Sequence, residues 1–148
     1  MATSAKKFFT DEQQAEILNA VKEAELNTSG EIRVHIENKC EGDVAGRSVY
    51  LFKKLGMTKT EQRNGVLFYL AVEHRKFAIL GDVGIDKVVS ENFWDEVKEI
   101  MLTNFKEGRF TEGLTEGILL AGNQLKEHFP HQLNDKNELP DDVSFGNN

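Results

Sequence analysis

Cysteine and long apolar segments are scarce in this chain of 148 residues. Cys40 is the only cysteine, so neither an internal disulfide nor a zinc site built on several thiolates can form. The longest apolar run covers residues 66–72, far too short to cross a bilayer. No apolar stretch follows the two lysines near the N-terminus, as a signal peptide would require. We therefore expect a cytoplasmic protein without membrane insertion.

The chain also has fewer basic than acidic residues. The 18 Lys and Arg residues face 25 Asp and Glu residues, which gives a net charge of −7. Such a field repels phosphate backbones and argues against nucleic acid as a partner, while it suits divalent cations. With 39% hydrophobic and 29% charged residues, the composition is that of a globular chain. We expect one domain over residues 1–130 and an acidic C-terminal tail over residues 131–148.

Hydrophobic periodicity predicts an α/β fold, a three-layer-like sandwich with a small mixed sheet and about four helices in the order α-β-α-β-β-α-α. The strands are expected over residues 31–37, 66–72 and 77–80. The helices are expected over residues 11–26, from the Asp43 cap to Gly56, from the Ser90 cap to Gly108, and over residues 111–129.

Two of these elements have unusual side chains. The first strand alternates strictly and places Arg33 and His35 on a polar face, which we expect to be exposed to solvent. The last helix contains Gly113 and Gly117, each costing roughly 1 kcal/mol relative to alanine in a helix. A close approach to the sheet or to another helix would compensate for this cost.

Three polar segments are expected to meet at one end of the sheet. The crossover helix makes the first two strands parallel, and the short connection after Val72 makes the third antiparallel. The start of the first strand, the approach to the second and the exit of the third then converge. These segments are Ser29-Gly30-Glu31, Arg63-Asn64-Gly65 and residues 81–86.

This convergence supports a candidate site. Carboxylates of Glu31, Asp82 and Asp86 could provide oxygen ligands for calcium or magnesium. Arg63 could hold a phosphate or neutralise an acid, with Ser29 and Asn64 as further ligand-binding candidates. The alternative is that these glycines and polar residues only form the turns and caps that strand ends need.

Familiar catalytic motifs are absent from the sequence. Gly84 is not followed by the Lys-Ser/Thr of a phosphate-binding loop, and no His-Glu-x-x-His, Gly-x-Ser-x-Gly or Cys-His arrangement occurs. His128 and His131 flank Phe129-Pro130 at a helix end, which favours surface histidines over a metal pair. Trp94 is interpreted as a core anchor. No nucleophile stands out, so catalytic residues stay unassigned.

The same segments resemble the TPM domain, a family of thylakoid-lumen and bacterial proteins once grouped as a domain of unknown function. The resemblance covers about residues 8–129 and rests on these motifs in order: Ser29-Gly30-Glu31-Ile32-Arg33-Val34, Arg63-Asn64-Gly65-Val66-Leu67, Arg75-Lys76-Phe77-Ala78-Ile79, Gly81-Asp82-Val83-Gly84-Ile85, and Phe105-x-x-Gly108-x-Phe110-x-x-Gly113-Leu114. It implies an α/β sandwich with a mixed sheet.

The resemblance implies two different functions. Plant members are associated with acid phosphatase activity and divalent-cation binding, and other members look like accessory proteins of membrane complexes. The family's acidic site maps onto Glu31, Asp82 and Asp86. Typical members also have a signal peptide and a C-terminal transmembrane segment or glycine-rich tail, which this sequence does not show. Two expectations follow: a non-catalytic binding or accessory module with an unknown protein partner, or a weak metal-assisted phosphatase acting on phosphomonoesters.

The tail retains apolar residues in an otherwise acidic segment. Leu139, Val143 and Phe145 are residues that a purely solvating tail rarely contains. Pro140 restricts Leu139 to an extended conformation. We therefore expect the tail to dock along a groove of its own domain or of a neighbour.

Overall fold

A mixed four-stranded sheet lies at the centre of the protein. The computed structural model describes residues 5–130 and 143–146. The strand order is β3-β2-β1-β4, with β1 and β2 parallel and β3 antiparallel to β2, as the sequence predicts. The strand bounds are Glu31–Glu37 for β1, Gly65–Ala71 for β2, Lys76–Gly81 for β3 and Val143–Phe145 for β4.

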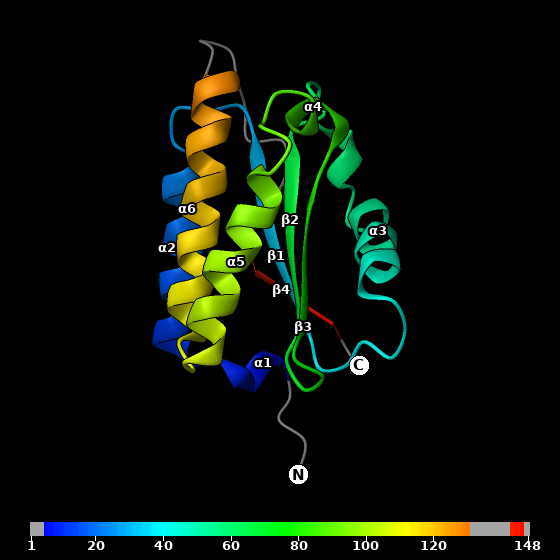
Figure 1. Ribbon diagram of the computed structural model, residues 1–148, viewed down its shortest axis with the longest axis vertical. Helices are drawn as coiled ribbons and strands as arrows, with labels where there is room; N and C mark the ends of the chain where they lie inside the picture. The colour runs from blue at the N-terminus through cyan, green and yellow to red at the C-terminus, as the bar shows by residue number, and fades with distance from the viewer. Residues whose placement is uncertain (1–4, 131–142, 147–148) are drawn as a thin grey trace.

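Helices cover the sheet on both faces, which confirms the three-layer α/β architecture (Figure 1). Three long helices lie on one face and one helix lies on the other (Figure 1). None of the described helices is long and apolar enough to span a membrane. The three are α2 (Asp11–Glu25), α5 (Phe93–Lys106) and α6 (Phe110–His128), the single helix is α3 (Val44–Lys54), and the short elements are α1 (Ala5–Phe8), η1 (Met57–Lys59) and α4 (Val83–Asp86).

The structure departs from the sequence prediction at three places. The third long helix begins at Phe93 and not after Ser90, because the Ser90 carbonyl accepts the Phe93 N–H in a preceding turn at 3.0 Å. The segment over residues 81–86, expected as a loop, contains the single turn α4. Val143–Phe145 form a strand that the sequence did not predict. Residues 131–142, with His131 and Leu139, lie outside the described residues.

The glycines of α6 allow close packing between helices. A Cβ atom on Gly122 would lie 2.5 Å from the Cβ of Ala24 in α2, and one on Gly117 would lie 2.7 Å from the Met101 sulfur in α5. The Gly122 contact also involves the Ala24 Cα at 2.7 Å, so a side chain there would force α2 and α6 apart, whereas Met101 could move its flexible side chain. The predicted close approach is therefore confirmed, and it explains why α6 tolerates residues of low helix propensity.

The polar side of β1 is largely buried and not exposed. His35 and Glu37 are 5% and 1% exposed, so the prediction of solvent exposure is wrong for His35. The reason is that the His35 ring stacks on Tyr69 of β2, with ring centroids 6.4 Å apart, and touches Ser144 of β4, while the Arg47 side chain reaches Glu37 from α3. Glu37 is neutralised there by Arg47, whose Nε donates to Oε1 at 2.9 Å and whose second guanidinium nitrogen reaches Oε2.

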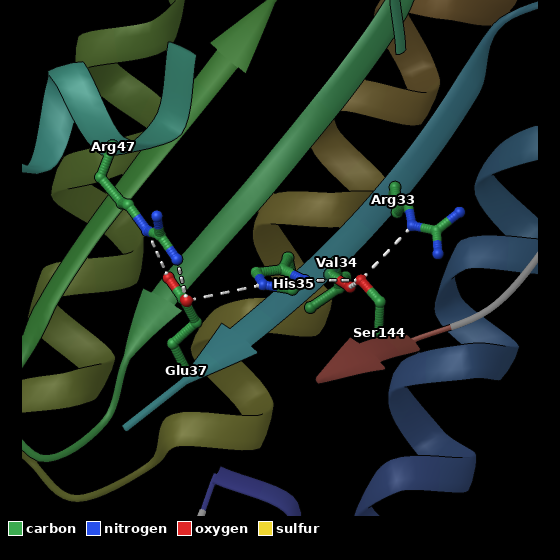
Figure 2. A network of polar contacts seen from close by, with 6 residues as sticks. All are labelled: Arg33, Val34, His35, Glu37, Arg47 and Ser144. Atoms are coloured by element: carbon green, nitrogen blue, oxygen red, sulfur yellow. Dashed lines mark hydrogen bonds and ion pairs between the residues drawn. The ribbon is translucent and has the colours of Figure 1, made fainter. Parts of the chain in front are cut away.

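A polar network joins this buried layer to the C-terminal strand (Figure 2). The His35 Nδ1 lies 2.7 Å from the Ser144 hydroxyl, and the Arg33 Nε donates to the same hydroxyl at 3.4 Å. On the other side of the ring, Nε2 lies 4.0 Å from Glu37 Oε2 and has no hydrogen-bond partner among the described residues. β4 is thus attached by a side-chain network as well as by its pairing with β1.

Electrostatics favour a neutral His35. Burial lowers the pKa of His35 below its usual value of 6.5, Glu37 acts in the opposite direction, and the charges of Arg33, Arg47 and Lys54 lower it further. Burial alone would raise the pKa of Glu37, but its bonds to Arg47 outweigh this effect and the pKa lies below its ordinary value. At neutral pH both shifts favour an ionised Glu37 beside an uncharged His35 imidazole.

Removal of β4 should destabilise the domain. Val143 is 9% exposed and pairs with Val34 at the edge of β1, and Phe145 packs against the core. A chain ending at Asp142 should lose about 1–3 kcal/mol of unfolding free energy, because partly buried apolar side chains return to water. Thermal unfolding measured by circular dichroism checks this. A chain ending at Gly146 is the matched control, and equal melting temperatures for both truncations would contradict a docked strand.

The stability of the domain should fall as the pH drops below the ordinary histidine range. A group whose pKa is lower in the folded than in the unfolded state contributes stability above the unfolded value, and this contribution is lost as the pH falls through the folded value. Urea unfolding at pH 8 and pH 5 should therefore give a smaller free energy at pH 5. His35→Asn should reduce this difference, whereas His128→Asn on the exposed end of α6 should leave it intact. An undiminished difference in His35→Asn would rule out His35 as its source.

Candidate functional site

The starts of β1 and β2 and the end of β3 meet at the end of the sheet that carries α4, at the upper end of Figure 1. Glu31 pairs with Gly65, and the Asp82 N–H donates to the Gly65 carbonyl at 2.9 Å. Glu31, Gly65 and Asp82 therefore form one row across three adjacent chain segments. The convergence expected from the topology is present in the backbone.

Asp82 is the most constrained carboxylate of this cluster. Its side chain is 5% exposed and is held by Arg63, with Nε donating to Oδ2 at 2.6 Å and a terminal nitrogen donating to Oδ1 at 2.8 Å. The Val83 N–H also donates to Oδ1 at 2.8 Å, so Asp82 caps α4. The Arg63 side chain is itself 45% exposed. A buried carboxylate is thus neutralised by a cation that reaches it from the surface.

The backbone of Arg63 is fixed by its contact with α4. The Gly84 N–H donates to the Arg63 carbonyl at 2.8 Å. A Cβ atom at Gly84 would lie 2.1 Å from the Gln62 carbonyl oxygen, which no side chain can tolerate. Arg63 itself has a φ of 52°, in the left-handed region. Gly84 is therefore required so that the turn can aim Arg63 at Asp82.

Ser29 and Asn64 also come together. The Ser29 hydroxyl donates to Gln62 Oε1 at 2.6 Å and accepts from the Asn64 amide at 3.2 Å. The Asn64 N–H is bound by the Thr60 hydroxyl at 3.1 Å, and Asn64 is 1% exposed. Both partners of Ser29 are side-chain amides, which take up no proton at neutral pH. The hydroxyl is positioned by them, but they do not activate it as a nucleophile.

Asp86 lies one helical turn beyond Asp82, where its N–H donates to the Asp82 carbonyl at 3.0 Å. Its Oδ1 accepts the Trp94 indole N–H at 2.8 Å. Partial burial raises the pKa of Asp86, the Trp94 hydrogen bond lowers it, and the nearby charge of Asp82 raises it again. Asp82 and Asp86 therefore repel each other across one turn of α4.

Glu31 is buried and separate from the two aspartates. It is 4% exposed and lies two strands from Asp82, which corresponds to roughly 9–10 Å between Cα atoms. Met57 of η1 fills the space above the intervening Gly65, where a Cβ atom would lie 2.9 Å from the Met57 carbonyl oxygen. Across the described residues, no group of three or more His, Cys, Asp or Glu side chains could hold a metal ion. The cation site at Glu31, Asp82 and Asp86 stays a prediction.

Sequence reasoning missed three residues of this cluster. Gln62 and Trp94 provide side-chain partners, and Met57 divides Glu31 from Asp82. Trp94 was interpreted as a core anchor, and it does pack against the core while its indole nitrogen bonds Asp86. The sequence offers no signal for the bond between Trp94 and Asp86, because it depends on how α5 returns to the sheet. Nothing in the spacing of Met57 indicates that it would lie over Gly65.

Comparisons with known proteins support the resemblance to the TPM domain. A family model for the TPM domain matches residues 3–124. No protein of curated function matches the chain.

Among solved structures, the NMR structure of the BA42 protein from the psychrophilic bacterium Bizionia argentinensis is 44% identical in sequence. The match covers 99% of this chain and 100% of that one, with a TM-score of 0.88. The N-terminal domain of a P. gingivalis protein has a TM-score of 0.70 at 19% identity, over 84% of this chain and 82% of that one. The N-terminal domain of the cg2496 protein from Corynebacterium glutamicum has a TM-score of 0.63 at 11% identity, over 95% and 83%. These last two show a shared fold, and the family match shows that this chain belongs to the TPM-domain family.

Proposed function

We propose that this protein is a non-catalytic binding module whose strand-end cluster takes a divalent cation, calcium or magnesium. The observation that supports this is the pairing of a buried Asp82 with a half-exposed Arg63. The guanidinium occupies both oxygens of the carboxylate in a place that solvent can reach. A hard cation that displaces Arg63 would bind Asp82 in its stead.

Asp86 is the second ligand in this proposal. Asp82 and Asp86 lie one turn apart on α4, and the charge of Asp82 raises the pKa of Asp86. A divalent cation would relieve this repulsion, which one guanidinium bound to Asp82 does only in part. Glu31, on the far side of Met57, would join only if η1 shifts. With Arg63 in its observed position the ligands are not assembled, so binding would be weak and would compete with Arg63.

The displaced Arg63, together with Ser29 and Asn64, would then form a polar surface for a protein partner. Binding is favoured over catalysis because the partners of the Ser29 hydroxyl, Gln62 and Asn64, are not bases. The buried free thiol of Cys40 suits a reducing compartment such as the cytoplasm, which we retain in the proposal.

Cation affinity should respond in opposite directions to two substitutions. Arg63→Gln removes the internal competitor and should tighten binding of Ca²⁺ or Mg²⁺ by roughly tenfold, in the range of a charge-assisted hydrogen bond. Asp82→Asn should weaken it beyond detection. Isothermal titration calorimetry with each metal measures both, with Asp95→Asn on exposed α5 as the matched control. Equal affinities in all four proteins would exclude this site.

The second candidate function is a weak metal-assisted phosphatase. The name of the matching family model refers to a phosphatase, and Arg63 offers a guanidinium fork that suits phosphate oxygens. In that case a cation at Asp82 would polarise a phosphoryl oxygen while Arg63 stabilises developing charge.

Turnover distinguishes the two functions. If the protein is a phosphatase, p-nitrophenyl phosphate should be hydrolysed in the presence of Mg²⁺, and Asp82→Asn should abolish this without unfolding the domain. The binding module predicts no hydrolysis that depends on Asp82. Turnover that is equal in the native protein and in a folded Asp82→Asn variant would place the activity elsewhere.

A further inference from the structure

A cavity lies at the end of the sheet opposite to α4, at the lower end of Figure 1. It has a volume of about 160 Å³ and is bounded by the β2–β3 hairpin, the end of α5, the start of α6 and α1. This volume is close to that of an engineered apolar cavity of about 150 Å³ that accepts benzene. The cavity therefore has room for one aromatic ring or one short branched chain.

Aromatic rings form much of its wall. Four half-buried phenylalanines from four different elements touch one another in a chain. Phe77 contacts Phe105 with ring centroids 5.1 Å apart, Phe105 contacts Phe110 at 5.5 Å, and Phe110 contacts Phe8 at 5.2 Å. Leu102 lies at the rim with 42% of its surface exposed. An apolar surface that remains half open is a favourable place for an apolar ligand.

The mouth of the cavity is basic, although the protein has a net charge of −7. Arg75, from the turn between β2 and β3, and Lys106, from the end of α5, both line it and are both exposed. Within residues 5–130 and 143–146 neither is recorded in a hydrogen bond or an ion pair. Glu107, the acidic neighbour of Lys106, is engaged by Arg109. Two cations without a counter-charge thus stand beside an aromatic wall.

Arg75 lies in the turn between β2 and β3. Arg75 has a φ of 54°, in the left-handed region that glycine or asparagine adopts more readily. Lys76 lines the cavity as well, but its Nζ donates to the Cys40 carbonyl at 2.8 Å on the other face of the sheet. The positive charge at the mouth therefore comes from Arg75 and Lys106.

We infer that this cavity binds a small apolar carboxylate, with one ring or a short branched chain seated on the phenylalanines and the carboxylate between Arg75 and Lys106. Burial of the apolar group provides most of the affinity, and the two cations select an anion over a neutral molecule of the same shape. The site is independent of the strand-end cluster, which lies at the opposite end of β2. Its validity does not depend on the proposed cation binding.

Titration of the full chain with phenylacetate, followed by ¹⁵N–¹H NMR, tests the inference. Amide signals of residues 72–77 and 102–110 should shift, with a dissociation constant on the order of 1 mM for so small a ligand. Phenylacetamide, which has the same shape and no charge, should bind about three- to tenfold more weakly. The double variant Arg75→Gln, Lys106→Gln should lose the same factor for phenylacetate and nothing for the amide.

Lys98→Gln is the matched control, since it removes one exposed charge from α5 that is not part of the cavity wall, one helical turn before Leu102. Its affinity for phenylacetate should equal that of the native protein. The inference is overturned if shifts are absent up to about 20 mM or fall outside the cavity. It is also overturned if phenylacetate and phenylacetamide bind equally, because the basic mouth would then have no part in recognition.

Discussion

Burial of β2 on both faces is the constraint on which the other parts of the structure depend. All seven residues from Gly65 to Ala71 are buried, with Phe68 packed towards α6 and Tyr69 towards α3. A strand without a solvent face needs a helical layer on each side and a neighbouring strand at each edge. The parallel β1 and the antiparallel β3 provide those neighbours. Both ends of β2 are thereby surrounded by chain segments, and each end has a distinct chemical character.

The chain segments at the two ends of β2 contain different kinds of residue, so the two ends differ in chemistry. At the α4 end, turns rich in glycine and short polar side chains bring Arg63 and Asp82 together. At the hairpin end, aromatic residues from separate helices cluster around the turn. The face of the sheet that carries α3 has a third character, because the Glu37–Arg47 ion pair and His35 are buried there. A buried ion pair contributes little net stability, and loss of one partner is costly.

Much of the fold could be predicted from local patterns, and the parts that failed share a physical cause. The strand over residues 31–37 and the long helices follow from periodicity, which reflects burial on one side of an element. The alternating pattern of β1 predicts one polar face exposed to solvent. Periodicity cannot reveal that side chains from distant segments, Tyr69, Ser144 and Arg47, will cover that face. Capping was equally ambiguous: Ser90 precedes a helix, yet the turn to Phe93 uses its carbonyl. The strand at Val143–Phe145 is only three residues long, too short to give a period.

The candidate site also combines features that the sequence predicts with features that it does not. The convergence of Ser29, Arg63, Asn64 and Asp82 followed from strand order alone, and the hydrogen bonds among them are present. The distance of two strands between Glu31 and Asp82 follows from the same strand order, whereas the position of Met57 above Gly65 depends on tertiary packing. The partnership of Trp94 with Asp86 depends on how α5 returns to the sheet. Tertiary packing decides these contacts, and sequence spacing contains no record of it.

The pairing of β4 with β1 has a consequence for how the chain is made. The bond between His35 and Ser144 joins residues 109 positions apart, so this edge of β1 stays unpaired until Val143–Phe145 have been synthesised. At 5–20 residues per second, that interval is roughly 5–20 s on the ribosome. During it, the exposed backbone of β1 is open to other strands. This exposure therefore ends only after Val143–Phe145 have left the ribosome and paired with β1.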